Sequence, residues 1–316
     1  MRTHEILIPH RYDRADRERL AVRFDELDDA DVTVATTPDE TLSGIETATI
    51  AVSSSVPHEW LERESDLEWV QGTTAGYDHF DLDALSEAGV ALTTATGVHG
   101  QPIGEWALGA MLGIERDLFA ARDRQRDAVW LRDSGGELAS RTVGIVGLGA
   151  IGGRIAELAS AVGCRVVGTK RDPSTAPDAV DAVFPADELD EVLRQAEYLV
   201  LACPLTDETR GLIDRDAMRT MPRDAVVVNI ARGDVVDEDA LVESLQQGRL
   251  AGAALDVFST EPLPADSPLW DLPNVLVTPH VSGSTPHYYD RVAEIFAENF
   301  EHLAAGNPDG MRNRVV

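Results

Sequence analysis

A glycine-rich turn in the middle of the chain has the spacing of a phosphate-binding loop. Gly147, Gly149 and Gly152 form G-x-G-x-x-G in "VGIVGLGAIGGR", between an apolar stretch and a predicted helix. In this context the first glycine permits a tight turn, the second lets the backbone approach a pyrophosphate, and the third allows close helix–strand packing. The helix start, with Ala150 and Ile151, offers free N–H groups to phosphates. The motif therefore predicts a dinucleotide site; a purely structural glycine turn is the alternative.

The only lysine of the chain stands where such a site usually has an acid. Lys170 lies 18 residues past Gly152, at the end of the next predicted strand, and Arg171 follows it. An Asp or Glu there binds the ribose hydroxyls of NAD. A Lys–Arg pair, with Ser174 as a further hydroxyl donor, suits the 2′-phosphate of NADP instead. We expect NADPH to be preferred and NADH to remain possible; a solvated basic turn is the alternative.

Three polar side chains follow predicted strands later in the chain. Arg232 lies in "NIARGDVV", Glu261 in "DVFSTEPLP" and His280 in "VTPHVSGS". Ligands of open α/β sheets bind beyond the carboxyl ends of the strands. Each residue alone could be a surface arginine, a loop glutamate or an ordinary histidine. Only their order and spacing together are specific.

That order and spacing closely resemble the D-isomer-specific 2-hydroxyacid dehydrogenase family. The resemblance also covers "GTTAGYDHFDLDAL" (72–85), "GLGAIG" and "CPLTDETRGLI" (203–213), and it extends over residues 67–302. It implies that a nicotinamide cofactor donates a hydride to a 2-oxo acid, which becomes a D-2-hydroxy acid.

The resemblance also implies a role for each of the three residues. His280 would supply the proton in reduction and remove it in the reverse direction. Glu261 would pair with the imidazole and fix its tautomer. Arg232 would bind the substrate carboxylate through its guanidinium fork.

Further contacts are implied for both ligands. Asp256 would orient the nicotinamide carboxamide, and Arg232 and His280 would also border the cofactor. The other positions contribute backbone groups or small side chains: Cys203, Pro204 and Ala231 on the cofactor, and Ala75, Gly76 and Ser53 on the substrate. Cys203 is expected to be a packed thiol. His99 departs from the asparagine that the family often has, which affects substrate shape and not the reaction.

Other members of the same family remain alternatives. A phosphoglycerate dehydrogenase stays open, although a chain ending at Val316 leaves no room for the regulatory domain that many of them carry. Formate dehydrogenases have glutamine as the histidine's partner, so Glu261 argues against that activity. Dinucleotide-binding corepressors keep a similar triad, but the acidic composition and the lack of an added tail favour a metabolic enzyme.

The charge balance narrows the partners and the environment. The sequence has 56 acidic against 27 basic residues in 316, a formal net charge of −29. Such a surface repels nucleic acid and anionic membranes, so neither is expected as a partner. With lysine almost absent, the composition resembles a protein from a salt-in halophile; an ordinary acidic protein is the alternative. Two cysteines suggest neither a disulfide framework nor a metal site, and without a signal-like or membrane-spanning stretch we expect a cytoplasmic protein.

Alternating apolar strands and amphipathic helices must hold these residues in place. The pattern predicts parallel sheets covered on both faces, in two doubly wound α/β domains. A flavodoxin-like substrate domain would comprise 1–98 and 284–316, and a Rossmann dinucleotide-binding domain 99–283. One helical region is predicted over 104–127. Because the family commonly dimerises there, we expect a homodimer.

Overall fold

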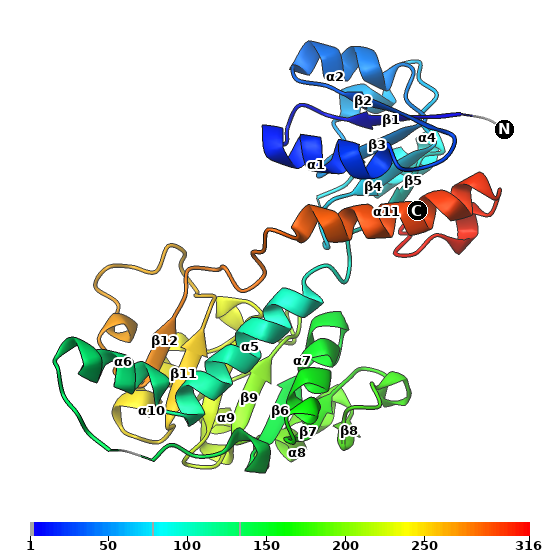
Figure 1. Ribbon diagram of the computed structural model, residues 1–316. Helices are drawn as coiled ribbons and strands as arrows, with labels where there is room; N and C mark the ends of the chain where they lie inside the picture. The colour runs from blue at the N-terminus through cyan, green and yellow to red at the C-terminus, as the bar shows by residue number, and fades with distance from the viewer. Residues whose placement is uncertain (1–2, 78, 133) are drawn as a thin grey trace. The chain divides into compact units, whose positions relative to one another are not determined.

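The chain divides into two compact units, Met1–His99 with Thr285–Val316 and Gly100–Ser284. The computed structural model describes residues 3–77, 79–132 and 134–316. Each unit has one parallel sheet with helices on both faces (Figure 1). The predicted fold class, two doubly wound α/β units, is confirmed.

The first unit contains a five-stranded sheet of order β2-β1-β3-β4-β5. Its strands are β1 (His4–Ile8), β2 (Ala30–Val34), β3 (Ile50–Ser53), β4 (Trp69–Gly72) and β5 (Ala91–Thr93). Its helices are α1 (Arg14–Phe24), α2 (Pro38–Ile45), α3 (His58–Leu61), α4 (Leu82–Ala88) and α11 (Tyr288–Ala304). The order is that of flavodoxin-like sheets, in which all strands run parallel and the strand order reverses between β1 and β3.

The helices of this unit cover both faces of the sheet, because the side chains of its buried strands point alternately to one face and to the other. On one face Ile6 and Trp69 contact α1 and α11 through Phe24 and Phe296, whose rings lie 4.1 Å apart. The side chain of Leu7 points to the opposite cluster, which includes residues of α2, α3 and α4. Because successive side chains of a strand point to opposite faces, a continuous apolar strand requires this double cover.

The second unit contains a seven-stranded parallel sheet of order β12-β11-β10-β9-β6-β7-β8. Its strands are β6 (Thr142–Val146), β7 (Arg165–Thr169), β8 (Ala182–Phe184), β9 (Tyr198–Leu201), β10 (Val226–Asn229), β11 (Gly252–Leu255) and β12 (Val275–Val277). Its helices are α5 (Gly100–Glu115), α6 (Leu118–Arg126), α7 (Ala150–Ala161), α8 (Leu189–Leu193), α9 (Arg215–Thr220) and α10 (Glu238–Gln246). This is the Rossmann order, with the switch point between β6 and β9.

Helices cover the two faces of this sheet in separate clusters. α5 and α7 pack together on one face, against a cluster that includes Ile145 and Val200 (Figure 1). α8, α9 and α10 cover the opposite face, where Leu199 and Val227 lie. The carboxyl ends of all seven strands therefore lie at one edge, and the loops that carry the predicted site residues begin there.

The structure differs from the sequence expectation in several short elements. The helical region predicted over 104–127 is two helices, because the chain breaks at Asp117, which has φ 53°. Strand β8 and helices α2, α4 and α9 have only three to eight residues, so each is too short to show a clear period in the sequence.

Candidate active site

The glycine-rich turn links β6 to α7. Gly147 has φ +96°, and a Cβ there would lie 2.9 Å from Cys203 Cα. A Cβ on Gly152 would lie 2.1 Å from the carbonyl oxygen of Gly147, so packing excludes side chains at both positions. A Cβ on Gly149 would meet no described atom within 4 Å, and its φ of −86° suits any residue. The protein's own packing therefore does not require glycine at 149, whereas close approach of a ligand would.

The start of α7 faces the same edge of the sheet. Gly149 is its N-cap residue and provides no side-chain acceptor. The first N–H groups of a helix have no partner inside the helix, and here they include those of Ala150 and Ile151. With the partial positive charge of the helix N-terminus, this turn is chemically suited to a pyrophosphate.

The basic loop follows β7, the neighbour of β6. Lys170 Nζ donates to the carbonyl oxygen of Thr175 at 2.5 Å, and Arg171 is exposed. Among the described residues, no carboxylate oxygen lies within 4.0 Å of either cation. Ser174 donates both its N–H and its hydroxyl to Asp172 Oδ1, at 3.1 and 2.6 Å. Asp172 was not among the predicted site residues, because in the sequence it resembles an ordinary turn aspartate.

The loop after β9 contacts the glycine-rich turn. Cys203 is buried, its Cα lies against Gly147, and burial raises the pKa of its thiol. A thiol of raised pKa is a poor nucleophile at neutral pH. The hydroxyl of Thr209 donates to the carbonyl oxygen of Pro204 at 2.6 Å and holds the start of this loop.

The loop after β10 presents Arg232. The side chain of Asn229 accepts a hydrogen bond from Ala231 N–H at 3.0 Å and donates to the carbonyl oxygen of Arg232 at 3.1 Å. Gly233 fits directly against Phe258, where a Cβ would lie 1.9 Å from the backbone carbon. The Arg232 side chain is exposed, and its NH1 donates to the carbonyl oxygen of Ala231 at 2.7 Å. Backbone packing thus fixes the loop and leaves the guanidinium at the edge of the sheet.

His280 and Glu261 form a hydrogen-bonded pair at the carboxyl end of β12. His280 Nδ1 lies 2.8 Å from Glu261 Oε2, and Glu261 Oε1 accepts a hydrogen bond from Phe258 N–H at 3.0 Å. Burial opposes ionisation of Glu261, but the bonds from His280 and Phe258 outweigh it, and its pKa lies below the ordinary value. An ionised carboxylate accepts only, so Nδ1 carries the proton and Nε2 is left to exchange one.

The backbone at His280 is strained and is held by Asp256. His280 has φ 53°, uncommon for a residue other than glycine, and its N–H donates to the carbonyl oxygen of Asp256 at 2.9 Å. The Asp256 side chain is fully buried. Its Oδ1 accepts from the Thr278 hydroxyl at 2.5 Å and from Val281 N–H at 2.9 Å, and its Oδ2 accepts from Ser282 N–H at 2.8 Å. Strain maintained by such a network is typical of functional sites.

A cavity of about 390 Å³ borders the histidine–glutamate pair. Its walls are largely apolar and consist of Phe258, Glu261, Pro262, Leu263, Trp270, Val277, Pro279 and His280. The indole N–H of Trp270 donates to the carbonyl oxygen of Pro264 at 2.9 Å. The cavity thus places apolar side chains beside a pair whose own side chains are 52% (His280) and 37% (Glu261) exposed.

The predicted substrate-binding residues of the first unit lie at the carboxyl edge of its sheet. Ser53 is completely buried and donates its hydroxyl to the carbonyl oxygen of Ser55 at 2.7 Å, so its side chain shapes the loop after β3. The hydroxyl of Thr74 holds the carbonyl oxygen of Gly76 at 2.8 Å, and that of Thr96 holds the carbonyl oxygen of Ala75 at 3.0 Å. Asp78, in the same segment, lies outside the described residues. His99 contacts the ring of Tyr288 at 5.3 Å.

The described residues contain no group of three or more His, Cys, Asp or Glu side chains that could hold a metal ion. No helix in the described part of the chain is long and apolar enough to cross a membrane. The glycine-rich turn, by contrast, is compatible with a dinucleotide, because the space beside Gly149 is open and a pyrophosphate could approach the backbone there.

The family's sequence model matches this arrangement. A sequence model of the family, described as "D-isomer specific 2-hydroxyacid dehydrogenase, NAD binding domain", matches residues 108–282. Among solved structures, a D-isomer specific 2-hydroxyacid dehydrogenase family protein from Aeromonas salmonicida is 30% identical, with TM-score 0.78 and 99% of each chain covered. A D-isomer specific 2-hydroxyacid dehydrogenase from Xanthobacter autotrophicus, in complex with NADPH and MES, is 31% identical, with TM-score 0.78 over 100% of this chain and 98% of the other.

Curated relatives fall into two groups. The D-3-phosphoglycerate dehydrogenase of Methanocaldococcus jannaschii is 32% identical over 90% of this chain, but the chain spans only 55% of that protein's length. The glyoxylate reductase of Thermofilum pendens is 31% identical over 84% of this chain and 80% of its own. The family match, the Rossmann sheet and the full-length structural relatives agree, and the chain belongs to the D-isomer specific 2-hydroxyacid dehydrogenase family.

Proposed function

We propose that the protein reduces 2-oxo acids to D-2-hydroxy acids with NADPH as the preferred hydride donor. The observation that carries the proposal is the His280–Glu261 pair, whose 2.8 Å bond fixes Nδ1 as the donor and leaves Nε2 to transfer a proton. A bound reduced nicotinamide would supply the hydride. The chain itself then has to bind the substrate carboxylate, place the carbonyl carbon and protonate the carbonyl oxygen.

Three parts of the chain would perform these tasks. Arg232, an exposed cation without a carboxylate within 4.0 Å among the described residues, would bind the substrate carboxylate in bidentate fashion. His280 Nε2 would give its proton to the carbonyl oxygen as the hydride reaches the carbon, and Glu261 would stabilise the charged imidazolium from which the proton leaves. Asp256 would hold the strained backbone that aims the imidazole.

Removal of the acid tests this mechanism. His280→Ala should lower kcat by about 10²–10⁴-fold, the usual effect of losing an acid–base group. His287→Ala, which removes an exposed histidine of the first unit, is the matched control and should leave kcat unchanged. Near-native reduction by His280→Ala would contradict the assignment, and chiral analysis of the product would test the D configuration.

The basic loop after β7 supports the preference for NADPH. Lys170 and Arg171 lie at the carboxyl end of the strand next to the glycine-rich turn, where the adenosine ribose binds in Rossmann sheets. A 2′-phosphate can form charge-assisted hydrogen bonds with both cations, and a 2′-hydroxyl cannot. NADH would remain usable, because the pyrophosphate and nicotinamide contacts are the same for both cofactors.

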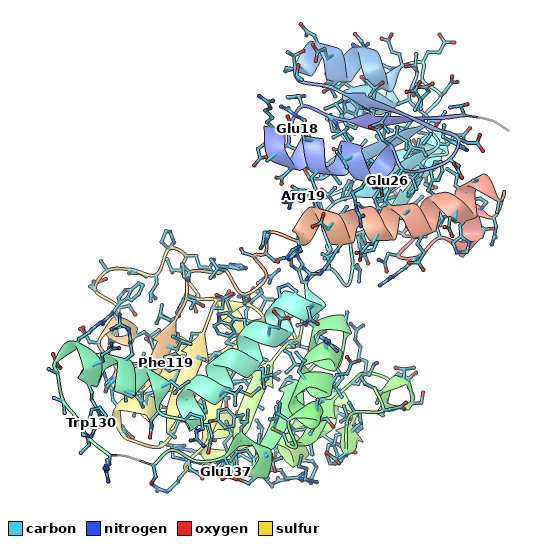
Figure 2. The ribbon with its side chains drawn as sticks, viewed as in Figure 1. Glu18, Arg19, Glu26, Phe119, Trp130 and Glu137 are labelled. Carbon is cyan, nitrogen blue, oxygen red and sulfur yellow. The ribbon has the colours of Figure 1, made fainter. Side chains whose placement is uncertain are left out.

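An exposed apolar segment supports a homodimer. After α5 the chain continues through α6, and this helix and residues 129–131 beyond it carry exposed large apolar side chains (Figure 2). Trp130 is 91% exposed, and Leu118, Phe119, Val129 and Leu131 are also exposed. Exposed apolar residues close together in sequence on a highly acidic protein indicate a protein–protein contact. A second copy of the chain is the proposed partner.

One experiment tests both the proposed homodimer and the proposed adaptation to high salt. We expect a homodimer that is active in molar salt and that weakens as salt is removed, because repulsion among 56 acidic residues is then no longer screened. Sedimentation and activity should be measured at several salt concentrations. Behaviour that does not change with salt would reject the adaptation, and a monomer at every concentration would reject the dimer.

A phosphoglycerate dehydrogenase-like activity is the second candidate. It rests on the 32% identity with the Methanocaldococcus jannaschii enzyme. Assays with 2-oxo acids of increasing size, with and without a phosphate group, would separate the two candidates.

A further inference from the structure

The loop after β7, which carries Lys170 and Arg171, also carries an acid, Asp172. Asp172 is exposed and lies between Arg171 and the short turn Pro173–Thr175. Its Oδ1 accepts both the N–H and the hydroxyl of Ser174, and its carbonyl oxygen accepts the Thr175 hydroxyl at 3.0 Å. The two donors of Ser174, which the sequence suggested for a 2′-phosphate, are therefore already bound to a carboxylate.

This carboxylate is ionised at neutral pH. Hydrogen bonds from Ser174 hold the pKa of Asp172 below its ordinary value, and the charge of Lys170 lowers it further. Arg171 has an acidic neighbour as well. The pKa of Glu208 is lowered, first by a hydrogen bond with the Thr206 side chain and to a lesser degree by the charge of Arg171. Each cation of the loop thus lies near one carboxylate, although neither forms an ion pair within 4.0 Å.

Such a carboxylate affects the two cofactors in opposite ways. A dianionic 2′-phosphate bound by Lys170 and Arg171 would lie near the negative charge of Asp172 and would compete with it for the donors of Ser174. A ribose 2′-hydroxyl, in contrast, is a donor that an ionised carboxylate accepts. The acid missing at position 170 is present two residues later.

We propose that Asp172 is a specificity residue that opposes NADP and favours NAD, so that the preference created by Lys170 and Arg171 is partial. This inference rests on the proposed cofactor site and on the proposed preference for NADPH. It names a residue that weakens this preference and explains how one loop serves both cofactors.

Calorimetric titration of the full chain with NADP⁺ and with NAD⁺ in molar salt tests this role without relying on turnover. Asp172→Asn removes the charge and keeps an oxygen acceptor for Ser174. We expect the Kd for NADP⁺ to fall about twofold, the scale of one exposed charge contact under screening, and the Kd for NAD⁺ to stay constant or rise. Asp172→Ser, which also lacks the charge, should change the ratio in the same direction.

Asp31→Asn is the matched control, since it removes one exposed charge from β2 in the first unit. It should change neither Kd. The proposal is overturned if Asp172→Asn leaves the Kd for NADP⁺ unchanged or raises it, or if both Kd values change by the same factor, because Asp172 would then serve only the loop's structure. Wild-type protein that binds NAD⁺ more tightly than NADP⁺ would contradict the NADPH preference, whereas the ratio of variant to wild type would still decide the role of Asp172.

Discussion

Arginine has two different surroundings at opposite ends of the sheet in the second unit. At the amino end of β6, Arg141 is bound by two carboxylates, Glu115 and Glu197, and a third, that of Asp224, lies 3.7 Å from it. At the carboxyl end of β7, Arg171 and its neighbour Lys170 have no carboxylate within 4.0 Å among the described residues. In a chain with twice as many acids as bases, a cation without a close acid is the less expected of the two.

The two ends differ in burial as well as in pairing. The Glu115 side chain is 5% exposed, and Arg141 Nε lies 3.0 and 3.1 Å from its two oxygens. Arg141 NH1 lies 2.6 Å from Glu197 Oε1. Glu115 also accepts the buried hydroxyl of Tyr198 at 2.8 Å. At this end the charges satisfy one another and join α5 to the sheet, whereas the cations of the β7 loop remain available for an anion from outside the chain.

Removing the cation from the cluster of Arg141, Glu115 and Glu197 should have the largest effect on the free energy of unfolding. Arg141→Met leaves Glu115 buried without its cation, and we expect a loss of about 3 kcal/mol in the free energy of unfolding. This is the lower end of the range for a broken buried pair, because Arg141 is itself 31% exposed. Denaturant unfolding in molar salt measures the loss. The double variant Arg141→Met, Glu115→Gln should recover part of it, because the unpaired charge is gone.

The same variant should leave cofactor discrimination unchanged. If Arg141→Met altered the NADPH/NADH ratio of kcat/KM as strongly as a change in the β7 loop, the separation of a structural end from a ligand-binding end would be wrong.

Sequence reasoning predicts a ligand-binding role for the carboxyl end of the sheet, which stays a prediction, and misses the charge cluster at the amino end. The glycine spacing and the lysine 18 residues beyond it predict local chemistry, because a turn, a helix start and a strand end follow each other in the chain. Glu115 and Glu197 lie 26 and 56 residues from Arg141. No periodicity connects such positions, so only the fold reveals their contact. The break between α5 and α6 was missed for a related reason, since the helical pattern on both sides of Asp117 gives no sign of a left-handed residue.

For some of the predicted site residues the structure shows the expected contact, and for others it shows a contact that the sequence does not predict. His280 and Glu261 are predicted together, and the structure places them in hydrogen-bond contact. Asp256 was expected to orient the nicotinamide. The structure shows its two oxygens accepting three hydrogen bonds from the segment around His280, a relation that depends on the adjacency of β11 and β12. The cofactor role of Asp256 stays a prediction. Asp172 was missed because a turn aspartate has many ordinary explanations.

Removing the cations of the β7 loop should have the next largest effect, on binding and not on stability. For Lys170→Asp with Arg171→Ala we expect a loss of about 2–3 kcal/mol in the NADPH preference, the scale of hydrogen bonds to charged groups. The free energy of unfolding should change by no more than about 0.5 kcal/mol, as for other surface substitutions. The measurements are kcat/KM with both cofactors and denaturant unfolding. Equal use of the two cofactors by the wild type, or an unchanged ratio in the variant, would leave the two cations without a ligand.

The smallest effect is expected at Arg194, which separates pairing from burial. Arg194 forms ion pairs with Asp190 at 2.9 Å and Glu191 at 2.7 Å on α8, so by distance it is paired as closely as Arg141. All three side chains are at least half exposed. Water and salt therefore screen the attraction, and ordering long side chains costs entropy that offsets much of the gain. Arg194→Ala should lower the free energy of unfolding by no more than about 0.5 kcal/mol in dilute buffer, less in molar salt, and should leave the cofactor ratio unchanged. A loss near that of Arg141→Met would mean that the number of close carboxylates, and not the burial of Glu115, decides which arginines stabilise this protein.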